Sequence, residues 1–379
     1  MPTGLARWRD KLFITVPRWK RGVPSSLNYV YLNGSQQQEL NPYPSWGDAF
    51  VSDDACCVST NSSVVSAYRI HVDKCDRLWV VDNGVTDMFN NVKQITQPAI
   101  LVFDLYKDTL KYKHVFSDDL LRDSTVFTSI VVDIVDEDCR NAYAYISDMG
   151  SGALVVYDLR SDTAWRRESP LFKYEANASV YRVGGIDFFW NDGVSSVALS
   201  QKNSCGTKLL KISTRLLRNS DIGPEEFHNG VQIVGDRGPM SQATACDYDP
   251  GTNVLFYTQL SKNGVGCWNL DREFSEQNTP LLLSDCSLLE FPNDIKVKDY
   301  LDTFIYINRI DTYVIEREVD SEGDVWLLSD RQSRFLYGRI EPSRVNFRVL
   351  RAPAARLVRA TRCQLNALER AARMFKSIP

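Results

Sequence analysis

One strand pattern returns six times along this chain of 379 residues. Each copy is an apolar, aromatic-rich run that ends in small polar residues. Continuous apolar runs of this length are typical of strands that are buried on both faces of a sheet. The runs lie at residues 11–16, 77–84, 142–148, 195–200, 254–259 and 324–330, and their markers Phe13, Trp79, Tyr145, Val197, Phe256 and Trp326 are 52 to 70 residues apart.

This period predicts an all-β fold of the propeller type. A second strand follows most of the runs, as at residues 100–105, 154–159 and 335–340. A repeating unit of roughly 50 to 70 residues with about four strands is the signature of a propeller blade. Six units predict a six-bladed β-propeller, a ring that has no free sheet edge. Two packed β-sandwich domains are the competing architecture, but they do not explain the common spacing.

The polar residues that end the six runs predict a ligand site. In a propeller the first strand of each blade lines the central channel, and we assign the six runs to that strand. Their ends would then form a polar, partly acidic funnel at one mouth. At any single position, the preference of Asp and Asn for turns is a sufficient explanation. The ends are Thr15, Asp82, Asn83, Ser147, Asp148, Ser200, Gln259, Ser329, Asp330 and Arg331.

Composition restricts the classes of partner. The formal net charge of −4 argues against a nucleic-acid-binding protein, which normally has a strong basic excess. No stretch of 18 consecutive apolar residues occurs, so we expect no membrane-spanning segment. The sequence as given starts without a secretory signal peptide, which by itself would predict a cytosolic protein.

The nine cysteines indicate a different compartment. None has the paired spacing of a zinc site. Three glycosylation sequons begin at Asn33, Asn61 and Asn177, and sequons are used only in the secretory pathway. Scattered cysteines together with sequons favour an oxidising environment, and therefore a secreted, extracellular glycoprotein. The odd number leaves at least one thiol unpaired or joined to another chain.

Longer motifs are spread from residue 2 to about residue 363. They lie at residues 2–7, 13–19, 22–30, 42–46, 75–82, 145–148, 267–269 and 345–348, and include Gly-Val-Pro-Ser-Ser-Leu-Asn-Tyr-Val and Cys-Asp-Arg-Leu-Trp-Val-Val-Asp. Together they resemble the insect yellow/major royal jelly proteins. The resemblance implies a six-bladed propeller, secretion, and two disulfides, Cys75–Cys139 and Cys267–Cys363.

We expect a single propeller domain over residues 1–363 and a C-terminal tail over residues 364–379. The sequence departs from the family pattern in two places. Family members carry a signal peptide and a further segment before the motif at Pro2, including a strand that helps to close the ring. Without that strand, the ring would be incompletely closed and would expose a sheet edge. Residues 300–320 interrupt the family pattern and predict an inserted loop or hairpin.

The resemblance implies two molecular activities. Some members bind biogenic amines such as serotonin, dopamine or histamine in the channel, and others take part in melanin formation, including dopachrome conversion. An amine site needs a carboxylate, an aromatic wall and hydrogen-bond partners. We expect Asp330 or Asp148 to supply the charge, with an ion pair to Arg331 as the alternative role of Asp330. The other candidates are Phe127, Phe188 and Tyr257 for stacking, and Asn83, Thr128 and Gln259 for hydrogen bonds.

Catalysis would need a base of suitable pKa or a metal ion. The three histidines, His71, His114 and His228, have no metal-ligand spacing, and none ends a strand that faces the predicted channel. We therefore expect neither a metal nor a cofactor. Binding of a small aromatic amine or catechol, linked to insect pigmentation, ranks above a dopachrome-converting isomerase. A secreted structural or signalling protein without a working pocket is the third alternative.

Overall fold

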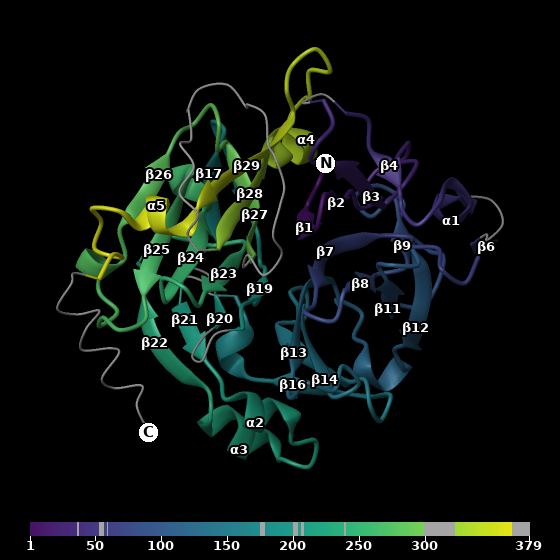
Figure 1. Ribbon diagram of the computed structural model, residues 1–379, viewed down its shortest axis with the longest axis horizontal. Coiled ribbons are helices and arrows are strands. Elements are labelled where there is room, and N and C mark those ends of the chain that lie inside the picture. The colour runs from purple at the N-terminus through teal and green to yellow at the C-terminus, as the bar shows by residue number, and fades with distance from the viewer. Residues whose placement is uncertain are drawn as a thin grey trace.

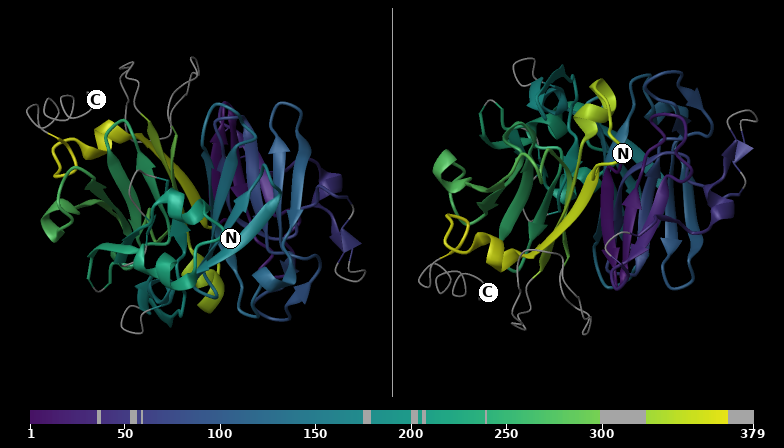
Figure 2. Two further views of the ribbon diagram at one scale, coloured as in Figure 1. Left: turned by 90° about the horizontal axis from the view of Figure 1, so that it is seen from below. Right: turned by 90° about the horizontal axis from the view of Figure 1, so that it is seen from above.

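The protein is an all-β propeller. Its computed structural model describes residues 1–35, 38–52, 57–58, 60–174, 179–199, 204–205, 208–238, 240–298 and 323–365. Antiparallel sheets are arranged around a central channel (Figure 1), and side views show their strands running roughly along that channel (Figure 2). Within these ranges, no helix is long and apolar enough to cross a membrane.

Five sheets of the described residues have four strands each and form complete blades. Their strands are β1 (Gly4–Trp8), β2 (Lys11–Thr15), β3 (Leu27–Tyr31) and β4 (Asn41–Pro42); β7 (Ala67–Val72), β8 (Arg77–Asp82), β11 (Ala99–Asp104) and β12 (Thr109–Val115); β13 (Phe127–Ile134), β14 (Ala142–Asp148), β15 (Ala153–Asp158) and β16 (Thr163–Glu168); β19 (Ser196–Val197), β20 (Ser204–Cys205), β21 (Lys208–Lys211) and β22 (Gln232–Asp236); β23 (Cys246–Asp249), β24 (Val254–Gln259), β25 (Gly264–Asn269) and β26 (Leu281–Ser284).

The last sheet differs from the others. It has three strands, β27 (Phe291–Lys298), β28 (Asp324–Asp330) and β29 (Phe347–Pro353). The propeller arrangement predicted from the repeat is confirmed, but the prediction of six blades is corrected to five complete ones. The reason is that no strand of the described residues pairs with the outer edge of β29.

Short elements connect and decorate the blades. One hairpin, formed by β17 (Val180–Val183) and β18 (Ile186–Phe189), contributes to the site described below. The remaining small strands and helices are β5 (Val51–Ser52), β6 (Cys57–Val58), β9 (Val85–Thr86), β10 (Lys93–Gln94), α1 (Trp46–Ala49), α2 (Thr214–Arg218), α3 (Pro224–Asn229), α4 (Gln332–Tyr337) and α5 (Ala354–Val358).

The innermost strands follow one another around the channel. They are β1, β7, β13, β19, β23 and β27, each of which contacts the next, and β27 returns to contact β1 (Figure 1). The Leu5 amide donates a hydrogen bond to Asp294 Oδ2 at 3.0 Å, which links β1 to β27 across this return. Because Asp294 is fully buried, its carboxylate has lost water as a partner and depends on such contacts.

The six apolar runs lie one strand further from the channel than predicted. Five of them form the second strands β2, β8, β14, β24 and β28, and only the run at 195–200 contains an innermost strand, β19. A second strand is paired along both edges and covered on both faces by neighbouring blades, so it is the most apolar strand of its sheet. Trp79 and Phe256 on β8 and β24 are accordingly inaccessible to solvent.

The cysteine predictions are confirmed where the structure describes them. Disulfides join Cys75 to Cys139 and Cys267 to Cys363, which closes the C-terminal segment onto the fifth blade. Cys246 is also disulfide-bonded, and Cys286 is an exposed free thiol. The insertion predicted at 300–320, the tail from residue 366 onward and the sequon at Asn177 lie outside the described residues.

Candidate functional site

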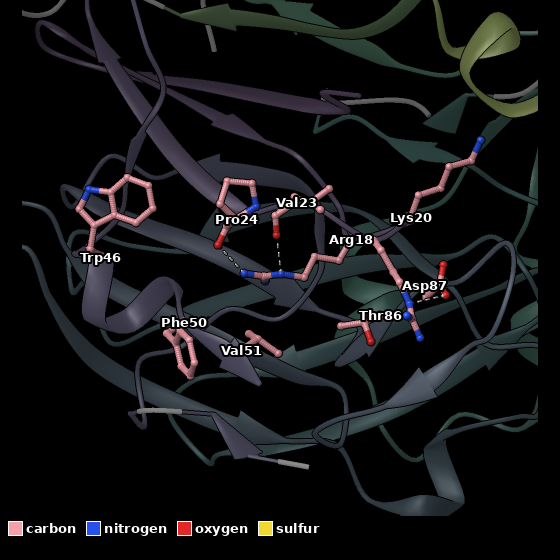
Figure 3. A pocket seen from close by; sticks show the side chains of 11 residues that line it. Arg18, Lys20, Val23, Pro24, Trp46, Phe50, Val51, Thr86 and Asp87 are labelled. Carbon is pink, nitrogen blue, oxygen red and sulfur yellow. Dashed lines mark hydrogen bonds and ion pairs between the residues drawn. The ribbon is translucent and has the colours of Figure 1, made fainter. Parts of the chain in front are cut away.

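One pocket lies at the side of the first blade, next to α1 (Figure 3). Its most prominent cation, Arg18, donates hydrogen bonds to backbone carbonyls that include those of Val23 and Pro24. Arg21 lies 3.5 Å from Asp87 and forms an ion pair with it, and Lys20 donates to the Phe335 carbonyl at 2.6 Å. The charged groups of this pocket therefore already have partners within the protein, so none of them indicates a particular ligand or reaction.

A second pocket lies in the central channel and has a volume of about 360 Å³. Its polar walls come from the innermost strands and the residues just before them, including Thr3, Arg69, Thr128, Thr244 and Asn293. A volume of this size falls in the range of small-molecule sites, roughly 300–1,000 Å³. This channel pocket is the candidate functional site.

Arg69 of β7 lines the pocket and bridges two other segments beside the channel. Its Nη1 donates to the Ser195 carbonyl at 3.1 Å, and its Nη2 donates to the Asn293 carbonyl at 2.7 Å. Its Nε lies 3.3 Å from Asp294 Oδ1, so the buried guanidinium is paired with a buried carboxylate. Contacts to two separate segments, one at Ser195 and the other on β27, keep this cation in place.

Aromatic rings form one wall of the pocket. Tyr181 of the β17–β18 hairpin stacks on Phe188 with ring centroids 5.2 Å apart, and Phe188 stacks on Tyr337 of α4 at 5.1 Å. Trp190 follows the hairpin, contacts both Tyr181 and Phe188, and donates a hydrogen bond to the Tyr337 hydroxyl. Stacked rings of this kind offer a flat apolar surface to a planar ligand.

A carboxylate, Asp192, lies beside this wall. It follows Trp190, and the next two residues fix its place because the amides of Gly193 and Val194 donate to the carbonyls of Met149 and Phe172, both at 2.9 Å. A Cβ atom at Gly193 would lie 2.6 Å from the Phe172 carbonyl oxygen, so only glycine fits at this close approach. Asp192 is the only aspartate or glutamate among the described residues that line the pocket.

Asp192 is distinguished by its raised pKa and by its lack of a partner within the described residues. Burial raises its pKa to about 6, and no hydrogen bond or ion pair satisfies the carboxylate within the described residues. Burial also raises the pKa values of Tyr68, Tyr181 and Tyr337, and the negative charge of Asp192 raises each of them further. These phenols are therefore protonated donors at neutral pH, grouped around a carboxylate that can accept a proton.

Tyr181 has the hydroxyl best suited to a ligand. The Tyr68 hydroxyl donates to Met88 Sδ at 3.3 Å and accepts from Trp19, while the Tyr337 hydroxyl accepts from Trp190. The Tyr181 hydroxyl forms no hydrogen bond to the described residues, although its side chain is nine-tenths buried in the pocket wall. Within the described ranges, no three His, Cys, Asp or Glu side chains are grouped so that they could hold a metal ion.

Of the ligand-binding residues predicted from the sequence, the structure places Thr128 on the pocket wall. Its hydroxyl donates to the Ser195 carbonyl at 3.1 Å. Phe188 stacks between Tyr181 and Tyr337, which line the pocket, but it is not one of the lining residues itself. Phe127 is packed in the core between the second and third blades. Ligand binding by Thr128 or Phe188 stays a prediction.

The other predicted polar residues support the backbone next to the channel. Asn83 exchanges two hydrogen bonds with the backbone of Phe127, at 2.8 and 2.9 Å. Asp148 accepts from the Val126 amide and forms an ion pair with Arg166, each at 2.9 Å. The oxygens and amide groups of these two side chains are bonded to the protein, and neither side chain lines the pocket.

Asp330 also lies behind the pocket, where it holds two of the lining residues. Its Oδ2 accepts from Asn293 Nδ2 at 3.0 Å, and its Oδ1 accepts from the Gln332 amide at 2.8 Å. Burial raises the pKa of Asp330 to about 7. The alternative ion pair with Arg331 is not formed, because Arg331 lies 3.6 Å from Glu290 instead.

Tyr257 and Gln259 of β24 are likewise outside the lining. The Tyr257 ring packs under the Arg237 guanidinium at 4.5 Å, and both β24 side chains are buried. One reason explains why the predicted residues at these strand ends do not line the pocket. The sequence pattern places the ends of the second strands at the channel, whereas in the structure the first strands face it.

Sequence reasoning missed Asp192, Tyr181 and the hairpin that carries the aromatic wall. Asp192 is followed by glycine, an Asp-Gly pair that predicts only a turn. The aromatic residues around it, Tyr181, Phe188 and Trp190, are visible in the sequence as a cluster between two repeats. That cluster was the one available signal, but nothing in it shows that it folds over the channel.

A sequence profile described as Major royal jelly protein matches residues 65–363, which is most of the chain. The chain belongs to the yellow/major royal jelly protein family. The family resemblance inferred from the motifs is therefore confirmed.

Several relatives within the family are similar over nearly the whole chain. L-dopachrome tautomerase yellow-f of Drosophila melanogaster is 32% identical over 96% of this chain and 82% of its own length. Dopaminechrome tautomerase of the same organism is 29% identical over 96% and 76%. Protein yellow of Drosophila melanogaster is 31% identical over 96% of this chain and 64% of its own length.

Solved structures add little to this assignment. A virginiamycin B lyase from Staphylococcus aureus shares 10% sequence identity and a TM-score of 0.40, over 86% of this chain and 76% of the lyase. A similarity at that level carries no argument about function.

Proposed function

We propose that this yellow-family protein converts an aminochrome, a cyclised catechol quinone of the melanin pathway, into its dihydroxyindole tautomer in the channel pocket. The observation that carries the proposal is Asp192, a carboxylate without a protein partner among the described residues, whose pKa is raised to about 6. Two relatives that match nearly the whole chain are named as tautomerases of such compounds, which supports the choice of substrate.

The reaction is balanced without a co-reactant. One proton from each of the two saturated ring carbons moves to one of the two quinone oxygens. The electrons of the broken carbon–hydrogen bonds form the new ring double bond and reduce the quinone to a catechol. Enzymatic catalysis of this shift needs a base at the ring carbon and a donor at a quinone oxygen.

The residues of the pocket can fill both roles. Asp192 is ionised near neutral pH and acts as the base. Its raised pKa brings it closer to the working pH, where proton transfer by a general base is most effective. The protonated Tyr181 hydroxyl donates to a quinone oxygen. Tyr181, Trp190 and Tyr337 stack against the planar ring and exclude water from it.

The pH dependence tests the role of Asp192. We expect kcat/KM for an aminochrome to fall about tenfold per pH unit below pH 6 and to level off above it, because only the ionised carboxylate can accept a proton. The measurement is the initial rate of loss of aminochrome absorbance between about pH 5 and 8, corrected for the uncatalysed reaction. A profile that is flat through pH 6, or that falls as the pH rises, would contradict this assignment.

Binding without turnover is the second candidate function. The same carboxylate, next to aromatic faces, suits the ammonium group of a biogenic amine such as dopamine. Isothermal titration separates the two candidates. Micromolar binding of dopamine by a folded protein that converts no aminochrome would favour the amine-binding function.

We also propose that the protein is secreted as a glycoprotein. The two disulfides fit an oxidising compartment, and the sequon residues Asn33 and Asn61 are both exposed. Expression through the secretory pathway of insect cells is expected to yield a chain whose mass falls after glycosidase treatment. Asn33→Gln and Asn61→Gln should each remove one glycan from the mass spectrum. A chain with no mass loss on treatment would overturn glycosylation at these positions.

A further inference from the structure

The described residues that line the channel pocket carry one negative charge and three positive ones. The anion is Asp192, and the cations are Arg69, Lys173 and Lys208. Arg69 is paired with Asp294, and Lys208 has an interaction partner of its own. Within the described part of the chain, the Lys173 ammonium group has no hydrogen bond, ion pair or ring contact. Lys173 is therefore the cation that can take up a ligand anion without breaking a contact in the protein.

Lys173 and Asp192 lie on backbone segments that pack directly against each other. The Val194 amide donates to the carbonyl of Phe172, the residue before Lys173, at 2.9 Å. A Cβ atom at Gly193 would lie 2.6 Å from the same carbonyl oxygen. A Cβ atom at Gly152, on the third packed segment, would lie 3.1 Å from the Cα atom of Lys173. Lys173 and Asp192 therefore occupy neighbouring backbone positions, and both residues line the channel pocket.

This arrangement matters because aminochromes occur in two chemical forms. An aminochrome made from an α-amino acid carries a carboxylate on one of the two ring carbons that lose a proton. An aminochrome made from the decarboxylated amine has hydrogen at that place. A substrate carboxylate at the reacting carbon would approach Asp192, and two like charges at close range repel each other unless a cation lies between or beside them.

We propose that Lys173 binds the substrate carboxylate, so that the pocket prefers an aminochrome derived from an α-amino acid over the decarboxylated form. The inference rests on the proposed function of the same pocket. Lys173 is a specificity-determining residue rather than a proton carrier. Its charge offsets the repulsion between the substrate carboxylate and Asp192, and it orients the reacting carbon towards that base.

The test compares two substrates with two variants of the full chain. L-dopachrome carries the carboxylate and dopaminechrome lacks it, and conversion of each is followed by absorbance and by the mass of the product. Wild type is expected to show a higher kcat/KM for L-dopachrome. In Lys173→Met, the ratio of kcat/KM for L-dopachrome to that for dopaminechrome should fall roughly tenfold, mainly through KM. The matched control is Lys107→Met, which removes an exposed lysine at the turn between β11 and β12.

The outcomes separate this inference from the proposed function. A Lys173→Met ratio equal to that of wild type and Lys107→Met, in proteins that convert both substrates, would overturn the role of Lys173 and leave the tautomerase function standing. A wild type that prefers dopaminechrome would overturn the inference in the same way. A folded wild type that converts neither substrate would overturn both. Circular dichroism and thermal melting of all three proteins establish that they are folded.

Discussion

Asp192→Asn is expected to lower kcat/KM for an aminochrome by a factor of about 10²–10⁴, because an amide cannot accept the proton that the carboxylate removes. The amide has nearly the same shape, so stacking of the substrate on Tyr181 and Trp190 should persist and KM should change much less than kcat. The measurement is steady-state conversion at about pH 7, where the wild-type carboxylate, with its pKa of about 6, is mostly ionised.

A matched control lies on the neighbouring hairpin. Asp187 of β18 is exposed and pairs with Arg182, at 2.7 Å, outside the pocket lining. Asp187→Asn should therefore retain wild-type kinetics. Asp192→Glu should recover part of the activity, because it restores a carboxylate at a displaced position. Equal rates in wild type and Asp192→Asn would remove Asp192 from the reaction.

Thermal stability gives a second readout of the same substitution. Burial raises the pKa of Asp192 to about 6, so the folded chain binds its proton more tightly than the unfolded chain does. The ionised carboxylate therefore destabilises the fold increasingly as the pH rises from its ordinary pKa to about 6, and by a constant amount above that. Asp192→Asn should stabilise the protein at neutral pH by about 1–2 kcal/mol, since the partly buried side chain keeps some contact with solvent.

Removing the Cys267–Cys363 disulfide is expected to destabilise the protein by about 4 kcal/mol. The bond joins residues 96 positions apart, so its loss returns the entropy of a long loop to the unfolded chain. Both sulfur atoms belong to the core between β23–β26 and β27–β29, and Asn269 Nδ2 donates to the Cys363 carbonyl at 2.9 Å. The double variant Cys267→Ser/Cys363→Ser avoids leaving a reactive thiol behind.

Thermal unfolding followed by circular dichroism measures this effect. For a chain of this size, a loss of 4 kcal/mol corresponds to a fall of roughly 5 °C in Tm. Cys286→Ser is the control, because Cys286 is a free and exposed thiol whose removal breaks no bond. A double variant that melts together with wild type and Cys286→Ser would show that the C-terminal segment is held by its other contacts.

Much of the fold could be predicted because blade formation is a local property. Each blade is built from described strands that follow one another along the chain, with only the small β9–β10 pair inserted in the second blade, so the alternation of apolar runs and turns predicts the blades directly. The family motifs added the two disulfide pairs, which spacing alone does not specify. The count of complete blades was wrong because the last sheet, β27–β29, lacks a fourth described strand, and the six apolar runs do not report the outer strand of a blade.

The site could be predicted much less well. Asp330 and Asp148 were chosen because they end apolar strands, and both prove to be buried and bonded to the backbone or to side chains beside the channel. The carboxylate that lines the pocket, Asp192, follows a hairpin outside the four-stranded sheets. Its neighbours Tyr68, Tyr181 and Tyr337 come from β7, β17 and α4. Positions so far apart in the chain share no spacing that a sequence pattern can reveal.

The amino-acid sequence by itself determined the propeller class, the family and the cysteine pairing, since these depend on local periodicity and on motifs read along the chain. Only the tertiary structure decided which strand of each blade faces the channel and which acid stands in the pocket. Apolar content marks the strand with most neighbours, not the strand next to the channel. The raised pKa of Asp192 comes from burial by groups that meet only when the ring is assembled.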